Sequence, residues 1–210
     1  MGRDRLGNDI DFSNRDFWNK RYLSDPELGS GIGSRGSNLL HKRAIIEAYL
    51  LSTRPDSILD VGCGDHRVLA DVDLGARDLG VDVSDEIVEI YRRKYPDRNF
   101  RRVNLAEDAE LQQAMRSDVV LCFEVLIHQH VEREYRRLVA NLVKLAARGG
   151  LISGYVDDPR PAVASEIIAY HEPVTSTLSS AGATDIRMVG RSLESDCLAF
   201  VSFHAPRAKD

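Results

Sequence analysis

Short runs of branched apolar residues alternate along the chain with longer stretches in which apolar residues recur at helical spacing. This alternation is typical of an α/β protein, in which crossover helices join parallel strands. We therefore expect a mainly parallel sheet with helices on both faces. The expected strands cover residues 58–61, 79–83, 99–105, 118–125, 151–156, 185–189 and 197–203.

Capping and chain-breaking residues mark the ends of the expected helices. Ser13 and Ser84 are placed to cap two of them, Pro96 stops the second, and Gly149-Gly150 ends a later one. The expected helices cover residues 15–22, 39–51, 65–70, 85–95, 106–115, 132–147, 162–170 and 174–180. The helix at 39–51 has an apolar stripe that we expect to face the core, formed by Leu40, Ala44, Ile45, Ala48 and Tyr49.

A polar side chain stands where each of the first four strands ends. These residues are Asp60, Asp82, Asn104 and Glu124. The carboxyl ends of parallel strands meet at one edge of a sheet, and open α/β sheets bind their ligands there. We therefore expect the four side chains to line one crevice.

The first two of these strand ends indicate the kind of ligand. Gly62 and Gly64 remove side chains where the backbone must turn and where a ligand approaches closely. Asp82 follows Asp60 by 22 residues, and a carboxylate at that distance can accept hydrogen bonds from both hydroxyls of a ribose. The sequence therefore predicts a nucleoside-bearing cofactor across these strand ends.

The segment before residue 39 has a composition of its own. Trp18, Arg21 and Tyr22 lie on one side of the first helix, which either packs on the domain or covers a ligand as a flap. The loop at 29–37 is rich in glycine and serine around Arg35, so it is either a flexible linker or a loop that binds a carboxylate. We favour ligand contact and divide the chain into a lid at 1–38 and a main domain at 39–210.

Composition and charge exclude some classes of protein. The 210 residues are 43% hydrophobic and 29% charged, which fits one globular domain. The net charge of −5 gives no general attraction to nucleic acid, and no apolar run is long enough to cross a membrane. The three cysteines lie in or beside apolar runs, which fits reduced thiols, and we expect a cytoplasmic monomer or homodimer.

The ordered motifs resemble those of the class I S-adenosylmethionine-dependent methyltransferases. The segment 58–64 looks like their first motif, Asp82 matches the acidic residue that closes their second strand, and 123–128 looks like their fourth-strand motif. Gly149-Gly150 sits where that family turns into its fifth strand. The resemblance covers roughly residues 35–205. It implies a Rossmann-like sheet of seven mostly parallel strands in the order 3-2-1-4-5-7-6, with the seventh antiparallel.

The same resemblance implies how S-adenosylmethionine, and its product S-adenosylhomocysteine, would be held. Asp82 would bind the ribose hydroxyls, Asn104 and Leu105 would border the adenine, and Phe123 and Glu124 would line the methionine side. The other implied cofactor contacts come from the lid and the first two strand ends, namely Trp18, Arg21, Tyr22, Gly33, Ser34, Arg35, Asp60, Gly62, Cys63, Gly64 and Val83.

An NAD-dependent dehydrogenase is the main competing interpretation. The stretch 62–67 supplies two of the three glycines in G-x-G-x-x-G, and Arg67 stands where close helix–strand packing needs a small residue. Asp60 before the first glycine is also more expected in a methyltransferase. The dehydrogenase is therefore discounted.

Methyl transfer to a hydroxyl requires an aligned acceptor and a general base, because a neutral alcohol is a poor nucleophile. His128, four residues after Glu124, is the first candidate for the base, with His171 second and His130 third. His128 could equally serve to pack and hydrogen-bond its loop. Glu124, His128 and His171 could instead gather a divalent metal such as Mg²⁺, but Ile127 replaces a second glutamate, so no metal site is assigned.

The acceptor is the least specified part of the function. No Asn/Asp-Pro-Pro-aromatic motif follows the fourth strand, which weighs against amino groups of nucleic-acid bases and glutamine. The chain looks similar to small methyltransferases of actinobacterial polysaccharide and secondary-metabolite pathways. We therefore expect O-methylation of a small molecule, with a sugar hydroxyl as the best single choice. The alternatives are a non-sugar metabolite or a non-catalytic module that binds S-adenosylmethionine.

Overall fold

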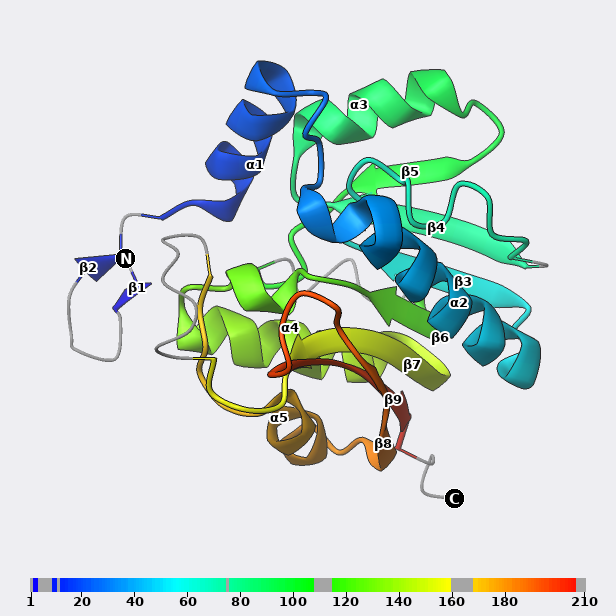
Figure 1. Ribbon diagram of the computed structural model, residues 1–210, viewed down its shortest axis with the longest axis vertical. Helices are drawn as coiled ribbons and strands as arrows, with labels where there is room; N and C mark the ends of the chain where they lie inside the picture. The colour runs from blue at the N-terminus through cyan, green and yellow to red at the C-terminus, as the bar shows by residue number, and fades with distance from the viewer. Residues whose placement is uncertain are drawn as a thin grey trace.

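Seven strands form one sheet at the centre of the computed structural model, which describes residues 2–3, 9–10, 12–74, 76–107, 115–159 and 168–206. The strands are β3 (Ser57–Val61), β4 (Arg77–Asp82), β5 (Asn99–Arg102), β6 (Ser117–Cys122), β7 (Ala146–Tyr155), β8 (Thr184–Arg191) and β9 (Leu198–His204). Their order is β5-β4-β3-β6-β7-β9-β8 (Figure 1).

The pairing of the strands confirms the expected topology. The strands from β5 to β7 pair in parallel, and β9 pairs antiparallel with both β7 and β8. Numbered in chain order, the sheet reads 3-2-1-4-5-7-6 with an antiparallel seventh strand. Because β3 and its neighbours β4 and β6 are parallel, their carboxyl ends lie at the same edge of the sheet.

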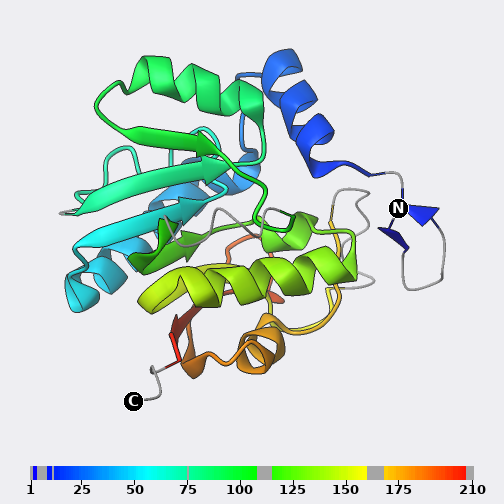
Figure 2. The same cartoon turned by 180° about the vertical axis from the view of Figure 1, so that it is seen from behind.

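Helices cover both faces of the sheet. α2 (Gly36–Thr53) lies on one face, while α4 (Glu132–Leu145) and α5 (Val174–Ser180) lie on the other (Figures 1 and 2). α3 (Asp85–Lys94) packs beside β4 and β5, and it also contacts α1 (Asn14–Ser24). Two short strands, β1 (Gly2–Arg3) and β2 (Asp9–Ile10), pair near the N-terminus. The described residues also include the 3₁₀ turns η1 (Ile32–Ser34) and η3 (Leu126–His128).

Alternation along the inner strands distributes the core between the two faces. In β3, Ile58 packs into the cluster under α2, whereas Leu59 and Val61 belong to the larger cluster under α4 and α5. Such period-two alternation in strands that are buried on both faces produces the continuous apolar runs seen in the sequence. Among the described helices, none combines the length and hydrophobicity that crossing a bilayer requires.

The two predicted helix caps are confirmed. The Ser13 hydroxyl accepts a hydrogen bond from the Asp16 backbone N–H at 3.2 Å, and the Ser84 hydroxyl accepts one from the Ile87 N–H at 3.3 Å. Each bond satisfies one of the backbone N–H groups that the first turn of a helix leaves without an intrahelical partner.

The face that α2 turns to the sheet differs from the prediction. Leu40, Ala44 and Ala48 of the expected apolar stripe are exposed, and Leu40 keeps 66% of its surface accessible. The helix instead buries Ile46 and Leu50, together with Lys42 and parts of Ile45 and Tyr49. The prediction was wrong because α2 is apolar on more than one side, so hydrophobicity alone does not select the inner face.

The expected helix at 65–70 is replaced by a series of turns. His66 has a left-handed backbone, with φ of 53°, which interrupts a right-handed helix at its second residue. The same histidine is buried against Tyr95 and Phe100, and its Nε2 lies 2.6 Å from a nitrogen of Arg98. Most of the expected helices at 106–115 and 162–170 lies outside the described residues.

Gly149-Gly150 does not end a helix, as expected, but lies within β7. The chain passes from α4 directly into this strand at Ala146. A Cβ atom on Gly149 would lie 2.1 Å from the backbone oxygen of Phe203, and one on Gly150 would lie 2.6 Å from the Phe203 ring. The glycines therefore allow β9 to approach β7 closely.

We predict that Gly149→Ala lowers the free energy of unfolding by about 1–3 kcal/mol, because the methyl group has to displace backbone of β9. Urea unfolding measures the loss. Ala147→Ser, at an exposed position on the same strand, is the control and should stay within about 0.5 kcal/mol of wild type. Wild-type stability of Gly149→Ala would contradict the close contact between the two strands.

Candidate active site

A cleft open to solvent lies at the carboxyl ends of β3, β4 and β6. Asp60, Asp82, Asn104 and Glu124 all line it, so the structure brings the four strand-end residues together as expected. The cleft therefore lies where open α/β sheets bind their ligands.

The turn after β3 is fastened to the end of β4. The Asp82 carboxylate accepts hydrogen bonds from the Gly64 N–H at 3.0 Å and from the Ser84 N–H at 2.9 Å. Burial raises the pKa of Asp82, and these backbone hydrogen bonds partly offset the rise. Gly62 and Gly64 have φ of 72° and 49°, and a Cβ on Gly62 would lie 2.1 Å from Val125, so this turn requires glycine.

Asp60 is a buried carboxyl group on the floor of the cleft. Burial raises its pKa to about 7, and the charges of Asp82 and Asp78 act in the same direction. Arg98 and Lys42 oppose the rise. Asp60 therefore changes its protonation near neutral pH, unlike an ordinary aspartate.

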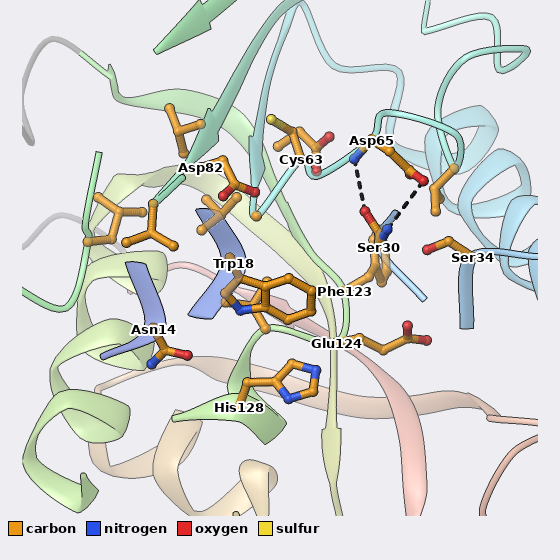
Figure 3. Close-up of a pocket in the computed structure, with 18 of the residues that line it drawn as sticks. Asn14, Trp18, Ser30, Ser34, Cys63, Asp65, Asp82, Phe123, Glu124 and His128 are labelled. Atoms are coloured by element: carbon orange, nitrogen blue, oxygen red, sulfur yellow. Dashed lines mark hydrogen bonds between the residues drawn. The ribbon is translucent and has the colours of Figure 1, made fainter. Parts of the chain in front are cut away.

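The N-terminal segment covers one side of the cleft, which Trp18, Tyr22 and Ser34 line together with Asn14 and Ser30 (Figure 3). The Ser30 hydroxyl accepts a hydrogen bond from the Asp65 N–H at 2.9 Å, and the Ser30 N–H donates to the Asp65 carboxylate at 3.3 Å. These bonds hold the glycine- and serine-rich loop against the turn after β3.

Four residues with an expected cofactor role do not line the cleft: Arg21, Gly33, Arg35 and Gly64. Arg35 was expected to bind a carboxylate of the ligand, but its guanidinium donates to the backbone oxygens of Glu27 and Leu28 and lies 3.7 Å from the Asp65 carboxylate. Arg21 similarly donates to the Gly29 oxygen at 3.0 Å. The expected residues that do line the cleft are Trp18, Tyr22, Ser34, Asp60, Gly62, Cys63, Asp82, Val83, Asn104, Leu105, Phe123 and Glu124.

The three candidate histidines separate clearly. His128 lines the cleft, and its ring contacts the Trp18 indole edge-on with centroids 5.2 Å apart. His171 lies outside the cleft, buried against Tyr135, with Nε2 2.6 Å from the Gln129 oxygen. His130 packs on the ring of Phe12. Geometry therefore speaks against His171 and His130 as the base and leaves His128.

The most informative residue that sequence reasoning missed is Lys42. Its side chain is only 2% exposed, it lines the cleft, and Nζ lies 2.6 Å from Oε1 of Glu124. A lysine in an amphipathic helix is normally solvated, so the sequence offers no signal for this contact. Glu124, Lys42 and His128 all line the cleft. Ser30, Asp65, Asn14 and Gln129 were also missed.

Metal binding by this region has little geometric support. In the part of the chain that the structure describes, no three His, Cys, Asp or Glu side chains come together as a metal site would require. In particular, His171 does not join Glu124 and His128 at the cleft.

Comparison with known proteins agrees with this site. Residues 59–152 match the family model described as "Methyltransferase domain". This segment runs from β3 into β7 and contains the glycine turn and Glu124. The match and the sheet order agree with the resemblance of the sequence motifs to those of class I methyltransferases. No curated protein sequence matches the chain.

Several solved structures share the fold. Magnesium protoporphyrin IX methyltransferase (ChlM) from Synechocystis PCC 6803, with bound S-adenosylhomocysteine, has a TM-score of 0.67 and 19% identity, over 90% of this chain and 97% of that one. N-methyltransferase NodS from Bradyrhizobium japonicum WM9, in complex with S-adenosylhomocysteine, has a TM-score of 0.67 and 14% identity, over 92% and 98%. 1,6-didemethyltoxoflavin-N1-methyltransferase from Burkholderia thailandensis has a TM-score of 0.63 and 20% identity, over 95% and 94%. At such identities the likeness is one of fold.

The raised pKa of Asp60 predicts a pH-dependent effect of Asp60→Asn. The folded carboxyl holds its proton up to about pH 7, whereas the unfolded one releases it near pH 4, so wild type loses stability as pH rises between these values. Asp60→Asn avoids this loss and should be more stable than wild type by up to about 4 kcal/mol at pH 8. Urea unfolding at pH 5 and pH 8 measures it. A stability difference that is independent of pH would contradict the assignment.

Proposed function

We propose that this chain transfers a methyl group from S-adenosylmethionine to a small-molecule acceptor. The observation that carries the proposal is the convergence of Asp60, Asp82, Asn104 and Glu124 on one cleft, beside a turn that requires glycine. The match to a methyltransferase domain supports it. Two of the structures with this fold, ChlM and NodS, were solved with S-adenosylhomocysteine bound.

The ribose is proposed to lie against Asp82. A carboxylate offers about four lone-pair positions, and two of those on Asp82 already accept backbone N–H groups. The remaining positions suit the two ribose hydroxyls, and the backbone bonds keep the carboxylate in place for them. Asn104, Leu105 and Val83 would then border the adenine, while Phe123 and Glu124 would line the methionine end.

The N-terminal segment is proposed to act as a lid at 1–38 over a cofactor-binding domain at 39–210. Trp18 and Tyr22 on α1 and Ser34 in η1 all line the cleft, so a bound cofactor would be covered by three points of the segment. The hydrogen bonds between Ser30 and Asp65 would hold the segment closed. A lid of this kind excludes water from the transferring methyl group.

A hydroxyl acceptor is proposed, with His128 as the general base. The imidazole lines the cleft beside Trp18 and Glu124, at the methionine end where the methyl group would lie (Figure 3). An in-line displacement from the sulfonium needs the acceptor oxygen held there and its proton removed as the new bond forms. Tests should begin with sugar hydroxyls. The acceptors named for the structural neighbours include a porphyrin and nitrogen atoms, so the panel should also contain phenols, carboxylates and amines.

We predict that Asp82→Asn weakens binding of S-adenosylhomocysteine by about 10–100-fold, because a charged acceptor for the ribose hydroxyls is lost. Isothermal titration calorimetry measures the affinity, with NAD as the ligand that should not bind. Asp97→Asn, at an exposed position that does not line the cleft, is the control and should bind as wild type. Binding of NAD alone would refute the cofactor assignment.

We predict that His128→Gln reduces kcat about 100–10,000-fold on the acceptor that the panel identifies, since the general base is removed. Binding of S-adenosylhomocysteine should stay within about twofold of wild type, because the change spares the ribose contacts. His130→Gln is the matched control and should retain kcat. Cofactor binding without turnover on any acceptor, by wild type and His128→Gln alike, would instead favour a non-catalytic module.

A further inference from the structure

The ion pair between Lys42 and Glu124 spans helix α2 and the end of β6. Nζ and Oε1 are 2.6 Å apart, and the two side chains are 2% and 16% exposed. Taking both charges out of water offsets most of their attraction, so a buried pair contributes little net stability compared with apolar residues of the same size. A pair in the wall of the ligand cleft therefore calls for a functional explanation.

Three further features of the structure fix the position of Glu124. Its backbone has φ of 58°, in the left-handed region that a residue other than glycine rarely adopts. Its N–H donates to the Ser153 hydroxyl at 2.6 Å. The loop before α2 then closes on the carboxylate at Gly33, where a Cβ atom would lie 2.0 Å from Oε2. The strained φ and the Ser153 hydrogen bond thus fix the backbone of Glu124, while Gly33 and Lys42 confine its carboxylate.

The charges around this carboxylate are mainly negative. Glu194, in the loop between β8 and β9, has a pKa raised by burial and by the charge of Glu124, and lowered by Lys42. The Asn38 amide donates to Glu194 at 2.9 Å and keeps it beside α2. The positive charge of Lys42 also lowers the pKa of Asp60. Among the described residues lining the cleft, Lys42 is the lysine that balances these acids.

We propose that Lys42 is a positioning residue, which holds the Glu124 carboxylate in place for the ammonium group at the amino-acid end of the cofactor. The inference rests on the proposed function. With Oε1 engaged by Lys42, Oε2 retains lone pairs for an ammonium donor. Without Lys42, the Glu124 carboxylate would lose its contact with α2 and would no longer be held in place for a cation.

Two ligands separate the role of the pair from the rest of the site. S-adenosylhomocysteine has the amino-acid end, whereas 5′-methylthioadenosine is the corresponding nucleoside thioether without it. Calorimetry at one fixed pH gives the ratio of their affinities. In Lys42→Met this ratio should fall about tenfold, because the carboxylate that would contact the ammonium group is no longer held in place.

Two control variants distinguish this role from simple structural support. Glu124→Gln should lower the ratio as well. The double variant, Lys42→Met with Glu124→Gln, should behave like Glu124→Gln in binding, yet unfold at a higher temperature than Lys42→Met because no buried charge is left unpaired. Methylthioadenosine should bind all the variants as it binds wild type.

The outcomes that overturn the inference are distinct from those that overturn the function. An unchanged ratio in Lys42→Met, or a parallel loss of methylthioadenosine binding, refutes the positioning role. Equal binding of both ligands by wild type refutes it too and leaves the cofactor assignment standing. Failure of wild type to bind either ligand refutes the proposed function and this inference together.

Discussion

The hydrogen bond from the Gly64 N–H to the Asp82 carboxylate is the contact on which the site depends. It joins the turn after β3 to the end of β4, and the Gly62 and Cys63 N–H groups reinforce the junction by donating to the Val81 oxygen. A Cβ atom on Gly64 would lie 2.3 Å from the Ser30 hydroxyl, so the N-terminal segment packs closely against this turn. The backbone geometry of this turn therefore shapes the cleft and also its contact with the N-terminal segment.

The sheet could be predicted from the sequence because its strands are buried on both faces. Each inner strand is a short run of branched apolar residues, and this pattern has few alternatives. The predictions that were wrong concern segments whose structure depends on a second apolar face or on the backbone conformation of one residue. Leu40 and Ala44 were predicted to face the core, but Ile46 and Leu50 occupy it. The left-handed backbone of His66 prevents a helix that residue propensity alone would allow. Gly149 reads as a helix stop, yet its role is the close approach of β9, which depends on a strand 50 residues away.

The candidate site divides in the same way. Asp60, Asp82, Asn104 and Glu124 could be found because strand ends are visible in the sequence and parallel strands bring them to one edge. Lys42 and Ser30 could not be found from the sequence, because their contacts depend on how α2 and the N-terminal segment pack against the sheet. His171 was misplaced because proximity to the fifth strand in sequence says nothing about the direction of its side chain, which packs on Tyr135 away from the cleft.

Under the proposed function, the acidic residues of the cleft interact differently with the cofactor before and after methyl transfer. Asp60, Asp82 and Glu124 face a cofactor that carries a sulfonium and an ammonium group, and Lys42 offsets only part of their charge. Methyl transfer turns the sulfonium into a neutral thioether, so the product meets the same acids with one positive charge fewer. An ionised carboxylate attracts the sulfonium of the cofactor but gains no such attraction from the neutral thioether. Under the proposed function, the acids at the strand ends therefore favour the cofactor before transfer over the cofactor after it.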